Sequence, residues 1–98
     1  MASIRNLKKD IDLIMSLALS DCFYVLEYND KIDEKAVYEI AGEIVTQHRA
    51  LRLRAMHPDG KDNPKMVKQF YKSLVQDMLA AADASLEKLS TEVKKVAN

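Results

Sequence analysis

An apolar repeat in the final third of the chain constrains the fold more than any other feature. Its seven members follow one another at alternating steps of four and three residues: Val75, Leu79, Ala82, Leu86, Leu89, Val93 and Val96. This spacing places them along one edge of a helix that packs lengthwise against other helices. No glycine or proline follows Pro64. The pattern therefore predicts one helix over residues 64–97, about 50 Å long at 1.5 Å per residue.

The first third of the chain predicts a second helix, over residues 4–29, with Ser3 as its N-cap. Apolar side chains recur through it at three- and four-residue steps, which predicts one buried face. A second row widens the apolar stripe and consists of Leu13, Leu17, Tyr24 and Tyr28. Because a stripe of this width exceeds what one partner covers, we expect this helix to touch two neighbours.

A third helix is predicted over residues 34–56, with Asp33 as its N-cap and an end at Pro58-Asp59-Gly60. Its apolar face contains Val37, Ile40, Ala41, Ile44, His48, Leu51 and Ala55. Gly42 lies inside this helix, where glycine is unfavourable, so we expect a neighbouring helix to approach closely there. Asn63 and Pro64 form the cap and first-position pair that opens the long C-terminal helix.

These three helices predict an all-α fold in one domain spanning residues 1–98. Two glycines and two prolines leave few places to turn, and short connections make neighbouring helices antiparallel. The prediction is therefore an antiparallel up-down-up three-helix bundle with a long C-terminal helix.

The unequal helix lengths predict a homodimer. The helix over residues 34–56 covers about 35 Å of a C-terminal helix near 50 Å, so the end of the longer helix should project with its apolar side bare. The predicted dimer interface consists of Leu79, Leu86, Leu89, Val93 and Val96. The alternative is that the C-terminal helix breaks between Ala80 and Ala84.

Charge is unevenly distributed although the formal net charge is zero. Residues 49–72 contain seven basic and two acidic residues, a balance of +5, whereas residues 10–43 contain nine acidic and two basic residues, a balance of −7. In the predicted bundle one end is therefore basic and the other acidic. Either the basic end binds an anion or an acidic partner surface, or it is a solvated face that favours solubility; we favour the second interpretation.

The candidate anion-binding residues at the basic end are Arg49, Arg52, Lys65, Lys68 and His48. His48 stands in an apolar row, where a lone histidine is more often a packed side chain than a proton carrier. Lys65 and Lys68 stand in the first turns of a helix, where the dipole already favours an anion. A site of this kind would hold a small carboxylate or phosphate.

Other chemistries have little support in the sequence. The single cysteine, Cys22, has apolar neighbours at helical spacing, which predicts a buried structural thiol of raised pKa. The spacing of His48 and His57 fits no metal motif, and we expect neither a metal, nor another cofactor, nor catalytic residues. No apolar run has the length of a membrane span. Zero net charge argues against nucleic-acid binding.

Two functions remain open for a chain of this kind, which we expect to be cytoplasmic. The favoured one is a non-enzymatic homodimeric module that acts by binding another macromolecule or a second copy of itself. The alternative is a small enzyme or ligand-binding protein that uses the basic end. The alternative requires a concave pocket that holds its cations and His48 together.

Overall fold

The computed structural model describes residues 4–57 and 63–97, which form three helices: α1 (Ile4–Tyr28), α2 (Glu34–Met56) and α3 (Pro64–Val96). Every boundary lies within one residue of the range predicted from the apolar spacing. The 33 residues of α3 form one uninterrupted helix, so the alternative with a break between Ala80 and Ala84 is wrong.

Polar side chains open α2 and α3 as the sequence predicts. The Asp33 carboxylate accepts a hydrogen bond of 3.2 Å from the backbone N–H of Ala36. The Asn63 side chain accepts from the backbone N–H groups of Lys65 and Met66, directly before Pro64 at the first helical position. These bonds satisfy N–H groups that have no partner inside the helix. The predicted cap Ser3 and the predicted stop at Pro58-Asp59-Gly60 lie outside the described residues.

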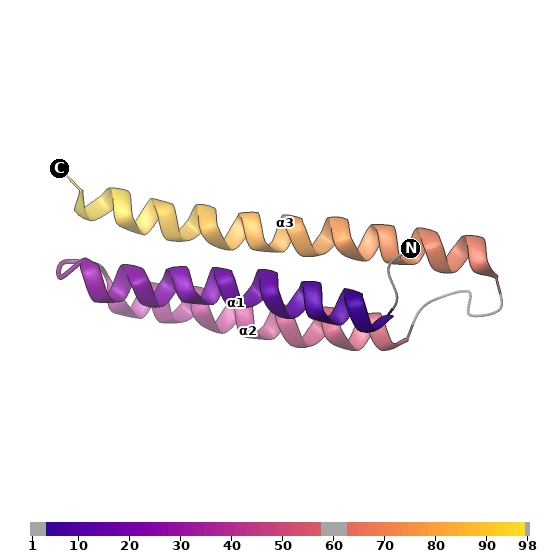
Figure 1. The fold of residues 1–98 in the computed structure, drawn as a ribbon. Helices are drawn as coiled ribbons and strands as arrows, with labels where there is room; N and C mark the ends of the chain where they lie inside the picture. Colours follow the sequence, from indigo (N-terminus) through magenta and orange to yellow (C-terminus); the bar gives the residue numbers. More distant parts are fainter. Residues whose placement is uncertain (1–3, 58–62, 98) are drawn as a thin grey trace.

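The three helices pack lengthwise into a bundle that measures 54 × 19 × 17 Å (Figure 1). α3 lies along both α1 and α2. Ion pairs fix the alignment of α2 with α3: Arg54 pairs with Asp77 at 3.0 Å, and Glu43 pairs with Lys88 at 2.8 Å.

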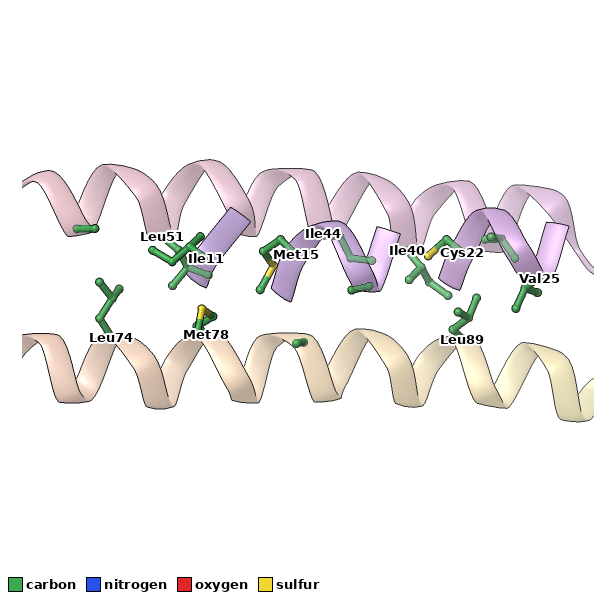
Figure 2. Packing of buried hydrophobic residues seen from close by; sticks show 14 of the residues in the cluster. Ile11, Met15, Cys22, Val25, Ile40, Ile44, Leu51, Leu74, Met78 and Leu89 are labelled. Carbon is green, nitrogen blue, oxygen red and sulfur yellow. The ribbon is translucent and has the colours of Figure 1, made fainter. Parts of the chain in front are cut away.

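The core is a single apolar cluster between the helices (Figure 2). The buried members on α1 are Leu7, Ile11, Met15, Ala18, Cys22 and Val25. Those on α2 are Val37, Ile40, Ile44, Leu51 and Ala55, and those on α3 are Leu74, Met78, Ala82 and Leu89. Ile32, in the turn between α1 and α2, closes one end. Cys22 is fully buried, as its apolar neighbours in the sequence predict.

The C-terminal half of α3 is covered by its own chain, contrary to expectation. Leu89 is only 4% exposed and lies near Cys22 and Val25 (Figure 2). Leu86, Val93 and Val96 are partly buried and also pack against the core. The reason is a lengthwise offset, because α3 extends beyond its neighbours at its Pro64 end (Figure 1). The argument for a dimer from a bare C-terminal end is therefore wrong.

Gly42 also differs from expectation. A Cβ atom built on Gly42 would meet nothing within 4 Å, and the residue is exposed on α2. No helix of the described chain approaches it. The Thr46 hydroxyl donates a 3.0 Å hydrogen bond to the Gly42 carbonyl oxygen. Glycine at this position therefore serves no packing purpose within the described chain.

Candidate functional site

One row of large apolar side chains on α1 faces solvent. We call it the outer row: Leu13 is 58% exposed, Leu17 54%, Tyr24 61% and Tyr28 64%. The expectation that α1 touches two neighbours is confirmed, because α1 packs against both α2 and α3, but the second apolar row itself stays exposed. An isolated exposed leucine is ordinary, but four such residues on one helix face mark a candidate binding surface.

Helical geometry explains why the outer row is left uncovered. At 100° per residue, it lies roughly 130° around α1 from the centre of the buried row. Both α2 and α3 pack on the buried side, so neither can reach it. The rings of Tyr24 and Tyr28 lie against one another with their centroids 4.5 Å apart. This contact forms an aromatic end to the row.

A flank of α3 extends the apolar surface beyond α1. Leu79 is 48% exposed, and Val75 and Leu86 on the same side of the helix are partly buried. Asp77 and Lys88, which pair with α2, mark the opposite side of α3. Because Leu79 lies about 160–200° around the helix from them, it belongs to the side next to α1. Of the five predicted interface residues, only Leu79 is exposed.

The five candidate anion-binding residues do not form one cluster. The His48 Nε2 atom lies 2.6 Å from the Asp12 Oδ1 atom, and the Arg52 Nε atom lies 3.5 Å from the same oxygen. These two groups thus already face a carboxylate of their own chain. Arg49, Lys65 and Lys68 are exposed.

An open groove of about 640 Å³ lies between the end of α2 and the start of α3. Its lining residues are Leu53, Arg54, His57, Met66, Gln69, Phe70 and Ser73. None of the five predicted anion-binding residues is among them. Arg54 is already paired with Asp77, so the groove does not gather free cations around a concave site.

The surroundings of Cys22 make its thiol unreactive. Burial raises the pKa of its thiol above the ordinary value of 9.0, and the charge of Asp21 raises it further. The thiolate is the reactive form of cysteine, so both effects disfavour nucleophilic or redox chemistry at this side chain.

Within residues 4–57 and 63–97, no three histidine, cysteine, aspartate or glutamate side chains are grouped so that they could hold a metal ion. None of α1, α2 and α3 is sufficiently long and apolar to cross a membrane, as judged over the same described residues.

Comparison with protein-family models, with curated proteins and with solved structures finds no match to this chain. The candidate functional site of the chain is the outer row. Its residues are visible in the sequence, but the apolar spacing does not say whether a helix of the same chain covers them.

Proposed function

We propose that the chain is a non-enzymatic helical module, folded as an antiparallel up-down-up bundle, that acts in the cytoplasm as a homodimer. The observation that carries this proposal is the outer row of α1, in which every member is more than half exposed. Burying such a row is favourable by roughly 25 cal/mol for each Å² of apolar surface removed from water. A second copy of the chain presents the same exposed apolar row.

Interhelical ion pairs support the antiparallel arrangement. Asp12 of α1 pairs with His48 and Arg52 of α2, and Arg54 and Glu43 of α2 pair with Asp77 and Lys88 of α3. The order of these partners supports a reversal of chain direction between α2 and α3. Short connections favour the same reversal between α1 and α2.

The alternative function, an anion-binding site at the basic end, has less support. Its histidine and one of its arginines are engaged with Asp12, and the groove nearest to the basic end is lined by other residues. A site that positions an anion requires its cations to converge on one point. We therefore do not propose this function.

Light scattering tests the homodimer directly. The expected mass at micromolar concentration is twice the 11.1 kDa of one chain. We further expect the substitution Leu17→Lys to raise the dimer dissociation constant at least about tenfold, because it places a charge in an apolar contact.

Leu53→Lys is the matched control, since Leu53 is a leucine of α2 with 61% exposure. It should leave the dissociation constant unchanged within about twofold. Circular dichroism should report the same helix content for both variants. A wild-type protein that is monomeric at micromolar concentration would overturn the homodimer, and equal effects of the two variants would exclude the outer row as its interface.

A further inference from the structure

We draw no further inference here: the strongest candidate, the outer row of α1 with the exposed flank of α3 beside it, carries nothing beyond the proposed function, because nothing in the structure shows what covers this surface.

Discussion

The two apolar rows of α1 differ in their exposure to solvent. The buried row from Leu7 to Val25 is covered by α2 and α3, whereas the outer row from Leu13 to Tyr28 faces solvent. Both rows are apolar and both follow helical spacing. The difference shows that spacing identifies an apolar face, while the arrangement of the other helices decides whether that face is covered within the chain.

The comparison also shows which side chains stabilise the fold of the single chain. Side chains of the buried row lose almost all contact with water in the single chain, so their burial stabilises the bundle itself. Side chains of the outer row are more than half exposed in the single chain, so their burial would stabilise only a complex of the kind proposed. Substitutions on the two sides should therefore affect different equilibria, one unimolecular and one bimolecular.

The largest expected effect comes from truncating the buried row. Ile11 is 0% exposed, and Ile11→Ala should lower the free energy of unfolding by about 2–5 kcal/mol, through lost apolar burial and the cavity left behind. Leu17→Ala, on the outer row, should change it by less than about 0.5 kcal/mol when the protein is dilute enough to be monomeric. Urea denaturation followed by circular dichroism measures both.

Protein concentration is the control for this pair of variants. The midpoint of Leu17→Ala should fall below that of wild type as the concentration rises into the dimeric range, because only wild type gains stability from association. A large loss for Leu17→Ala in the monomer would mean that the outer row belongs to the core, and the distinction between the two rows would fail.

The next effect concerns Cys22, which carries the thiol of the buried row. Cys22→Ser should lower the free energy of unfolding by about 1–3 kcal/mol, since it buries a hydroxyl where apolar neighbours offer few partners. In the wild-type protein the thiol should react with a disulfide reagent far more slowly in the folded state than in urea. Fast labelling of the folded protein would contradict the burial.

Because the pKa of the Cys22 thiol is raised in the folded state, the free energy of unfolding should depend on pH in the alkaline range. The folded state retains a proton that the unfolded chain releases above its ordinary pKa of 9.0. This contribution is complete below pH 9.0 and is lost as the pH rises through the folded-state pKa. The stability advantage of wild type over Cys22→Ser should therefore shrink as the pH rises above 9.0.

Much of the fold follows from local patterns that the sequence displays. The boundaries of α2 and α3 depend on Asp33 and on Asn63 with Pro64, whose hydrogen-bonding and backbone preferences act within a single turn. The buried row of α1 follows from its 3.6-residue period. These features depend on neighbours in sequence, so they can be predicted without knowledge of the tertiary structure.

The lengthwise offset of the helices could not be predicted in the same way. The apolar repeat of α3 could be buried against α1 and α2 in several lengthwise alignments that differ by one or two helical turns. Which alignment forms depends on how the side chains of the whole core pack. Helix lengths alone predict that Leu89 is bare, whereas the packing of the three helices buries it. The same choice of register decides which side of α1 is left for a partner.

A smaller effect is expected from the polar contact between α1 and α2. Asp12→Ala removes the partner of both His48 and Arg52, and should lower the free energy of unfolding by about 0.5–1 kcal/mol, because all three side chains are partly exposed and solvent screens their charges. The loss should diminish in about 1 M salt. Asp83→Ala, an exposed carboxylate of α3, is the control and should have no measurable effect.

The smallest expected effect has the opposite sign and tests an uncovered position on α2. Gly42 lies inside the helix with open space around its Cα, so Gly42→Ala should raise the free energy of unfolding by about 0.5 kcal/mol, through the lower entropy of the unfolded chain. Ala50→Gly, at an exposed position of the same helix, should lower it by a similar amount. If Gly42→Ala instead weakened the dimer, a second copy would approach α2 closely at that point, and the outer row of α1 would no longer account for the interface.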